Sequence, residues 1–172
     1  LNVEGFEINI REVLQELIVN YSPNGKSEHG NVIIMGNEKT GKTTLAKVIA
    51  NTTSADFVQM NATTSGKKDM EQAVSQAKDA FGMYGKKTIL FIDEIHRFNK
   101  AQQDYLLPFV EDGTVILIGA TTENPSFELN NALLSRARVY LLKSLTVAEI
   151  EQVLQQAISD PERGLGKERL VL

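Results

Sequence analysis

A lysine followed by a threonine lies in a glycine-bearing segment whose residue types suit phosphate binding. Residues 36–43 read Gly-Asn-Glu-Lys-Thr-Gly-Lys-Thr and fit G-x-x-x-x-G-K-S/T, the pattern of phosphate-binding loops. Glycines let backbone N–H groups turn toward phosphate oxygens, and a following helix adds positive potential at its N-terminus. Lys42 is expected to contact the β- and γ-phosphates of ATP, and the Thr43 hydroxyl to coordinate Mg²⁺. The residues predicted to contact the nucleotide are Gly36, Asn37, Glu38, Lys39, Thr40, Gly41, Lys42, Thr43 and Thr44.

Two acids follow an apolar run about fifty residues further along the chain. The sequence Ile-Leu-Phe-Ile-Asp-Glu over residues 89–94 has the form of a Walker B motif. Asp93 is expected to hold Mg²⁺, which prefers oxygen ligands, and Glu94 to orient and polarise the attacking water. Acids also simply close strands, but downstream of a phosphate loop the catalytic interpretation is favoured.

Two further pairs of residues have weaker signals when taken alone. Thr121 and Thr122 follow an apolar run, where a hydroxyl suits contact with the γ-phosphate or the attacking water; a threonine-rich turn explains them equally well. Arg136 and Arg138 flank the start of another apolar run. Either arginine could stabilise transition-state charge in a neighbouring subunit, or be an ordinary solvated side chain. His96 and Phe98 are predicted to be structural or to contact another subunit rather than to be catalytic.

The elements around these residues alternate between strand and helix. Apolar periodicity and turn residues predict both types. We expect strands over residues 31–35, 57–60, 88–94, 115–119 and 139–142, and helices over 8–21, 44–50, 70–81, 98–110, 131–134 and 146–158. Gly82 and Gly85 are predicted to end the helix over 70–81, and Thr146 and Glu149 to form a capping box. This alternation predicts an α/β fold with a mostly parallel sheet, whose carboxyl-terminal strand edge carries the site.

Composition narrows the classes of function. The 172 residues suffice for one domain with a full core. No apolar run approaches the roughly 20 residues that span a bilayer, so we expect no membrane contact. Cysteine is absent, which excludes disulfides and thiolate metal sites. The net charge is −4, so we expect any contact with DNA to be local or to come from other domains.

Taken together, these motifs resemble a known family. The series Lys42, Asp93-Glu94, Thr122 and Arg136 is similar to AAA+ ATPases of the clamp-loader clade. Three longer strings resemble the replication-associated recombination protein A family within that clade, and the resemblance covers roughly residues 61–172. The strings are DEIHRFNK with QQD and VEDGT over residues 93–114, GATTENPSFELN over residues 119–130, and ALLSRAR over residues 132–138.

The resemblance implies a three-layer P-loop fold with a five-stranded parallel sheet of order 5-1-4-3-2. Residues 1–160 would form the large α/β domain, and residues 161–172 would begin a linker toward a missing helical lid. It implies ATP hydrolysis at subunit interfaces of a homo-oligomer that acts on DNA at stalled or gapped replication forks. Such a protein would be cytoplasmic and nucleoid-associated, and could meet other replication proteins. Thr122 would be the sensor 1 residue, with Thr121 as the alternative, and Arg136 would be the arginine finger.

The sequence also departs from this family. Asn37-Glu38-Lys39 stand where the family has Pro-Pro-Gly, and the first ~50 residues are atypical for it. These departures leave open an alternative, a nucleotide-binding scaffold or hybrid fragment with little turnover. Asp93-Glu94-Ile95-His96 also suits a DExH-type helicase, but the second RecA-like domain and the Ser-Ala-Thr-type motif of that class are missing.

Overall fold

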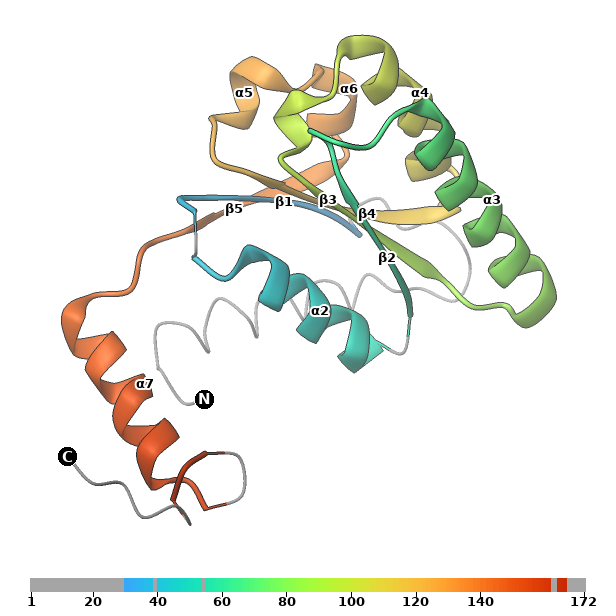
Figure 1. The fold of residues 1–172 in the computed structure, drawn as a ribbon. Helices are drawn as coiled ribbons and strands as arrows, with labels where there is room; N and C mark the ends of the chain where they lie inside the picture. Colours follow the sequence, from blue (N-terminus) through green and yellow to red (C-terminus); the bar gives the residue numbers. More distant parts are fainter. Residues whose placement is uncertain (1–29, 39, 54, 162–163, 167–172) are drawn as a thin grey trace.

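The computed structural model describes residues 30–38, 40–53, 55–161 and 164–166. The helix expected over residues 8–21 lies outside this part of the chain, as does Lys39 of the phosphate loop. Figure 1 shows a central sheet with helices on both of its faces.

The sheet has five strands in the order β2-β3-β4-β1-β5, and every neighbouring pair is parallel. This confirms the predicted five-stranded parallel sheet, since the expected order is the same one read from the other edge. The strands are β1 (Asn31–Gly36), β2 (Asp56–Asn61), β3 (Thr88–Asp93), β4 (Val115–Thr121) and β5 (Ala137–Leu142).

Helices form the two outer layers (Figure 1). Helix α2 (Lys42–Thr53) packs on one face through a core cluster that includes Leu45 and Ile49. The opposite face is covered by α3 (Lys67–Tyr84), α4 (Lys100–Glu111) and the short helices α5 (Pro125–Glu128) and α6 (Asn131–Leu134). Strands covered on both faces must be apolar almost throughout, which explains why β3 and β4 read as continuous apolar runs rather than alternating ones.

Several element boundaries differ from the predicted ones. Helix α3 continues through Gly82 and ends at Tyr84, so the prediction that Gly82 ends it is wrong. The helix ends there because Gly85 takes the left-handed conformation (φ 61°), so that its N–H donates to the carbonyl of Phe81 and the N–H of Lys86 donates to the carbonyl of Ala80. Strand β5 begins at Ala137, two residues earlier than expected, because its pairing with β1 starts at Asn31.

The segment after β3 also differs from the prediction. The strand ends at Asp93, and Glu94 adopts a left-handed backbone conformation instead of extending the strand. A short 3₁₀ helix, η1 (Ile95–Arg97), follows, and α4 begins only at Lys100. The single helix expected over residues 98–110 is therefore preceded by a tight turn, which begins directly after the two acids.

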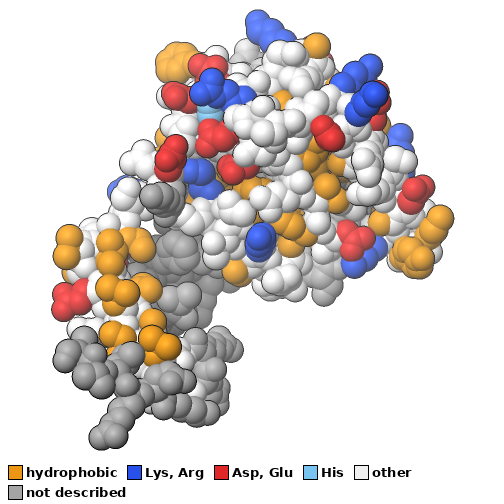
Figure 2. Space-filling view, viewed as in Figure 1, with side chains coloured by type: hydrophobic (Ala, Val, Ile, Leu, Met, Phe, Trp, Pro, Cys, Tyr) orange, Lys and Arg blue, Asp and Glu red, His pale blue; other side chains and the backbone are white. Residues whose placement is uncertain are grey.

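The last described helix, α7 (Val147–Ser159), extends away from the sheet (Figure 1). The predicted capping box is confirmed: Thr146 Oγ1 accepts from the Glu149 N–H, and Glu149 Oε2 accepts from the Thr146 N–H at 2.6 Å. None of its residues is buried, and apolar side chains are visible over it in Figure 2. Within the described part of the chain, no helix has the length and apolar character needed to cross a membrane.

Candidate active site

The phosphate loop leaves β1 at Gly36 and enters α2 at Lys42. A Cβ on Gly36 would lie 2.8 Å from the carbonyl oxygen of Leu142 in the neighbouring strand, so a larger residue does not fit without moving backbone. Gly41 needs glycine for a different reason, since its φ of +89° is rarely accessible to other residues. Its carbonyl accepts from the N–H of Leu45 and so begins α2. Both glycines of the motif therefore have defined conformational roles.

Lys42 lies within the loop rather than on the surface. It is 7% exposed, and its ammonium donates to the carbonyl oxygens of Gly36 and Asn37, both at 2.7 Å. A buried ammonium requires such partners, because burial without hydrogen bonds is costly. These contacts hold the lysine across the loop at the N-terminus of α2, where the first N–H groups of the helix have no intrahelical acceptor.

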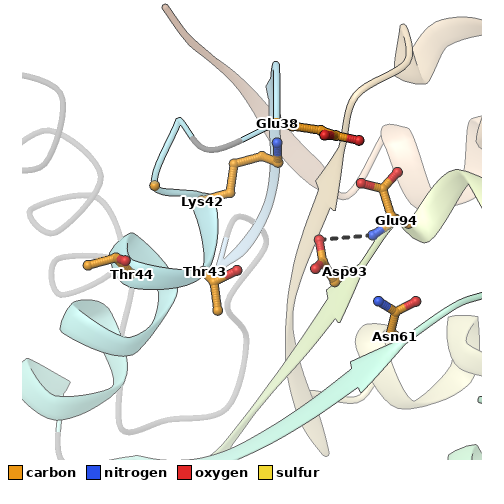
Figure 3. A pocket seen from close by; sticks show the side chains of 8 residues that line it. Glu38, Lys42, Thr43, Thr44, Asn61, Asp93 and Glu94 are labelled. Carbon is orange, nitrogen blue, oxygen red and sulfur yellow. Dashed lines mark hydrogen bonds between the residues drawn. The ribbon is translucent and has the colours of Figure 1, made fainter. Parts of the chain in front are cut away.

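The loop and the two acids share one cavity of about 500 Å³. Figure 3 shows that its wall combines the start of α2 with the ends of β2 and β3. The structure thus brings together residues separated by about fifty positions in sequence. The cavity is lined by Glu38, Gly41, Lys42, Thr43, Thr44, Asn61, Asp93 and Glu94.

The ends of the neighbouring strands explain this convergence. Asn61 and Asp93 are paired in register as the last residues of β2 and β3. The side chain of Asp93 accepts from the N–H of Glu94 at 3.2 Å, shown as the dashed line in Figure 3. Glu94 then turns away through its left-handed backbone (φ 53°, ψ 42°), which directs the two carboxylates differently although they are adjacent in sequence.

The two threonines after β4 have different surroundings. Thr122 donates to Glu94 Oε2 at 3.3 Å, and it lines a second hollow of about 280 Å³ together with Gly36 and Asn37. Thr121 is fully buried instead, with its hydroxyl 2.9 Å from His96 Nδ1. Of these two candidates, Thr122 is therefore the one that lies beside both the loop and Glu94.

Asn61 lines the cavity, but no sequence motif marked it as a site residue. Its Oδ1 accepts from the N–H and the hydroxyl of Thr63, at 2.9 Å and 2.6 Å, and thereby shapes the turn after β2. The sequence did contain one signal. A polar side chain at the carboxyl end of a parallel strand lies at the edge where such sheets bind ligands.

Arg136 does not join these residues. Its guanidinium bonds to the carbonyl of Ala132 at 2.9 Å and pairs with Glu111 at 2.6 Å. The Asn31 amide donates to the Arg136 carbonyl, so this residue lies at the amino end of β1, whereas the loop leaves the carboxyl end. The strand has six residues from end to end, and its five steps of about 3.3 Å each separate the two ends by roughly 16–17 Å. Arg138 lies within β5 and is exposed.

The donor set of the cavity fits a magnesium nucleotide. Thr43 and Asp93 supply a hydroxyl and a carboxylate, and Mg²⁺ is commonly held by one or two carboxylates with waters and substrate phosphates. Among the described residues, no cluster of three or more His, Cys, Asp or Glu side chains is placed to bind a metal by itself. The arrangement therefore suits a cation that arrives with phosphates better than a protein-only metal centre.

A five-stranded parallel sheet with a phosphate loop after β1 and acids after β3 defines a P-loop nucleotide-binding protein. Residues 32–145 match the family described as ATPase family associated with various cellular activities (AAA). The chain belongs to this family. The match includes the loop with its Asn37-Glu38-Lys39 departure, and it ends before α7.

Individual similar proteins indicate a narrower group within this family. The chain is 65% identical over 141 residues to replication-associated recombination protein A of Haemophilus influenzae, and 58% identical over 141 residues to that of Escherichia coli K12. Each alignment covers 82% of this chain and 31% of the relative. The structure of the Thermotoga maritima RuvB Holliday junction branch migration motor is also similar, with a TM-score of 0.68 and 26% identity, over 92% of this chain and 51% of that one.

These relatives confirm the resemblance to the recombination protein A family. They do not favour the alternative of a scaffold with little turnover. The aligned 141 residues exceed the expected range of 61–172, so the similarity extends into the part of the chain before residue 61. The chain spans about a third of the length of these relatives.

Proposed function

We propose that this chain is the ATP-binding and ATP-hydrolysing core of an ATPase associated with DNA replication and recombination. The observation that carries the proposal is the single cavity lined by Lys42, Thr43, Asp93 and Glu94. An ammonium, a hydroxyl and two carboxylates around one hollow are the groups that bind a magnesium nucleotide and activate water.

Phosphate binding is assigned to the loop and to the first turn of α2. An ammonium has three N–H donors, and the carbonyls of Gly36 and Asn37 take two from Lys42. The third is available to a phosphate oxygen without loss of the contacts that position the lysine. Backbone N–H groups at the start of α2 add further donors and the positive end of the helix dipole.

Thr43 and Asp93 are the residues proposed to hold Mg²⁺. Both contribute oxygen atoms to the cavity wall. When bound, the cation neutralises negative charge on the phosphates. Asp93 stays oriented because it accepts a hydrogen bond from the N–H of Glu94, so the metal-binding carboxylate and the acid next to it are held by one turn.

Glu94 is proposed to orient the water that attacks the γ-phosphate. In that reaction the water oxygen bonds to phosphorus, the bond to the ADP oxygen breaks, and the water proton is released toward a base. Thr122 contacts Glu94 directly, which supports its assignment as the sensor 1 residue over Thr121. The Thr122 hydroxyl would contact the γ-phosphate as well as Glu94, so its position would depend on whether that phosphate is present.

Arg136 is proposed to act on the nucleotide of a neighbouring subunit. It lies at the strand edge opposite the phosphate loop, too far to reach a nucleotide bound in its own subunit. A homo-oligomer in which this edge faces the next cavity would bring the guanidinium to the developing charge. This requirement links hydrolysis to assembly.

The substrate on which the assembly acts is proposed to be DNA at stalled or gapped replication forks. The support is similarity to replication-associated recombination proteins. Such work would place the protein in the cytoplasm at the nucleoid, near other replication proteins. With a net charge of −4, we expect the chain alone to bind DNA weakly at physiological salt, since phosphate neutralisation supplies most non-specific affinity.

Titration of ATP against the chain, with and without Mg²⁺, tests nucleotide binding. Saturable binding that Mg²⁺ strengthens is expected. Hydrolysis is then tested by Glu94→Gln in assemblies of this chain that turn over ATP. The amide should retain ATP binding and lose turnover, because it neither accepts a proton nor polarises water as a carboxylate does. Turnover at the parental rate in that variant would exclude the role given to Glu94.

A further inference from the structure

His96 is a buried histidine beside the two residues proposed to act on water and γ-phosphate. Its side chain is 7% exposed, in the η1 turn that follows β3. One ring nitrogen, Nδ1, lies 2.9 Å from the hydroxyl oxygen of Thr121 and 3.4 Å from Glu94 Oε2. The histidine therefore contacts both the carboxylate and the end of β4 that supplies Thr122.

The surrounding atoms indicate which ring nitrogen carries the proton. Thr121 Oγ1 accepts from the Glu123 N–H at 3.0 Å, and when its one proton points to the Glu123 carbonyl at 3.3 Å it is only an acceptor on the side facing His96. An ionised carboxylate is also only an acceptor. In that arrangement two acceptors lie close to Nδ1, which must then carry the ring proton; in the other arrangement the Thr121 hydroxyl donates to a bare Nδ1 at 2.9 Å.

Glu94 needs an anchor because neither its backbone nor its side chain fixes the carboxylate. Its left-handed conformation (φ 53°) is unfavourable for a residue with a Cβ and ends the strand ladder at Asp93. The side chain has several rotatable bonds and is 25% exposed. Two contacts converge on one of its oxygens: Thr122 donates to Oε2 at 3.3 Å, and His96 Nδ1 approaches the same atom at 3.4 Å.

We propose that His96 is a positioning residue for Glu94: its one Nδ1–H is shared between Thr121 Oγ1 at 2.9 Å and Glu94 Oε2 at 3.4 Å, while the buried Ile95 fixes the turn that carries the histidine. With Oε2 occupied by His96 and Thr122, the second oxygen, Oε1, is the one that engages the attacking water. This proposal rests on the function proposed for Glu94. It adds a role for a residue that the sequence indicates only as structural or as a contact to another subunit.

The packing beneath η1 supports a fixed position for the His96 side chain. Ile95 is fully buried, and a Cβ on Gly119 of β4 would lie 2.9 Å from its Cδ1. The absence of a side chain at Gly119 lets Ile95 pack directly onto the sheet. The next residue, His96, is thereby set at a defined height beside Thr121, the last residue of the same strand.

The first test is spectroscopic and needs no turnover. The chain has two histidines, His29 and His96, so His29→Gln leaves His96 as the only imidazole. Nitrogen-15 NMR of the ring in this protein should show Nδ1 protonated, and Glu94→Ala should shift the Nδ1 signal. A neutral ring protonated only at Nε2 would overturn the proposal, and so would a signal insensitive to Glu94→Ala.

The second test distinguishes a positioning role of His96 from a purely structural one. It compares two substitutions that put an N–H donor at different distances from the backbone. The amide nitrogen of Asn lies as many bonds from Cβ as Nδ1, whereas that of Gln corresponds to Nε2. In assemblies that hydrolyse ATP, His96→Gln should lower kcat about tenfold, less than the ~10²–10⁴ that a general base contributes. KM should change little, and His96→Asn should retain a clearly larger share of kcat.

Equal kcat losses in His96→Asn and His96→Gln, matched by equal losses of thermal stability, would show a structural role only. The failure of this inference is distinguishable from that of the proposed function. If Glu94→Gln abolishes turnover while His96→Gln leaves kcat unchanged, only the positioning role is wrong. If Glu94→Gln itself retains turnover, the proposed function fails as well.

Discussion

The guanidinium of Arg136 lies 2.6 Å from a carboxylate oxygen of Glu111, at the end of α4. Both side chains are about two-fifths exposed, at 40% and 42%. Such a surface pair adds little stability, typically about 0–1 kcal/mol. The pair matters more for orientation. Together with the Ala132 carbonyl, Glu111 holds the guanidinium at the amino ends of the strands, opposite the phosphate loop.

This placement predicts that Arg136 works between subunits. Arg136→Ala subunits and Lys42→Ala subunits, each inactive alone, should recover ATPase activity when mixed in an assembly. Each interface with an intact loop on one side and an intact arginine on the other can then complete a site. Arginine fingers contribute ~10³–10⁵ in rate, so the recovered activity should stand well above either variant alone in a steady-state phosphate-release assay.

Co-assembly of the two variants has to be demonstrated in the same samples, for example by tagging one and isolating the other with it. If the subunits co-assemble and no activity returns, the role between subunits is wrong. Arg138, in β5, then becomes the next candidate.

Lys42→Ala should weaken ATP binding. Hydrogen bonds to charged groups are worth about 1.5–3 kcal/mol, which corresponds to a Kd increase of about 10- to 150-fold. Lys47→Ala is the matched control, because Lys47 lies in the same helix with its side chain exposed and outside the cavity. Isothermal titration with ATP should show the loss only for Lys42→Ala, and equal affinities would remove the phosphate-binding role.

Glu38→Gln should strengthen ATP binding. The Glu38 carboxylate lines the cavity in which negative phosphates are expected. Removing a like charge in a partly solvated site is worth roughly 0.5–1 kcal/mol, or about two- to fivefold in Kd. Asp79→Asn removes the same charge from the exposed surface of α3 and should leave the affinity unchanged. The expected gain should shrink as salt is added, since added ions screen the repulsion.

The same substitution at two glycines should have opposite effects on stability. A Cβ at Gly119 would lie 2.8 Å from Ile33 Cδ1 and 2.9 Å from Ile95 Cδ1, both in the core, so Gly119→Ala should cost about 1–3 kcal/mol by overpacking. At Gly82, inside α3, a Cβ meets nothing within 4 Å, and Gly82→Ala should gain about 0.5–1 kcal/mol. Urea unfolding of the two variants measures both changes in the free energy of unfolding.

The N-terminal end of α7 should become less stable in acid. The backbone and side-chain hydrogen bonds from Thr146 hold the pKa of Glu149 below its ordinary value. Because this pKa is lowered in the folded state, the stability that ionised Glu149 adds is fully present above its ordinary pKa. That stability is lost as the pH falls through the lowered pKa. The protection of the amides in the first turn of α7, measured relative to their intrinsic exchange rates at each pH, should therefore fall over that window.

Glu149→Gln should abolish this pH dependence, because glutamine keeps the capping-box hydrogen bonds without a titrating group. Glu151→Gln, on the same helix and exposed, should leave it intact. Identical pH profiles for the two variants would contradict the assignment to Glu149.

The sequence by itself determined the fold class and most of the candidate site. Buried parallel strands need continuous apolar runs, and phosphate loops need glycine at defined spacings, so these local requirements are visible without coordinates. The strands predicted over residues 88–94 and 115–119 and the loop at 36–43 were recognised in this way, and the strand order then followed from the resemblance to a family.

Only the tertiary structure decided which polar side chains meet. Asn61 joins the cavity through its register with Asp93, and Glu111 pairs with Arg136 across 25 positions, as Glu94 does with Thr122 across 28. The left-handed backbone at Glu94, which brings His96 against its carboxylate, has no local sequence signal, since glutamate rarely takes it. Contacts of this kind depend on the order of the strands and on how the turns between elements pack against the sheet. The residue pattern of one segment carries no information about either.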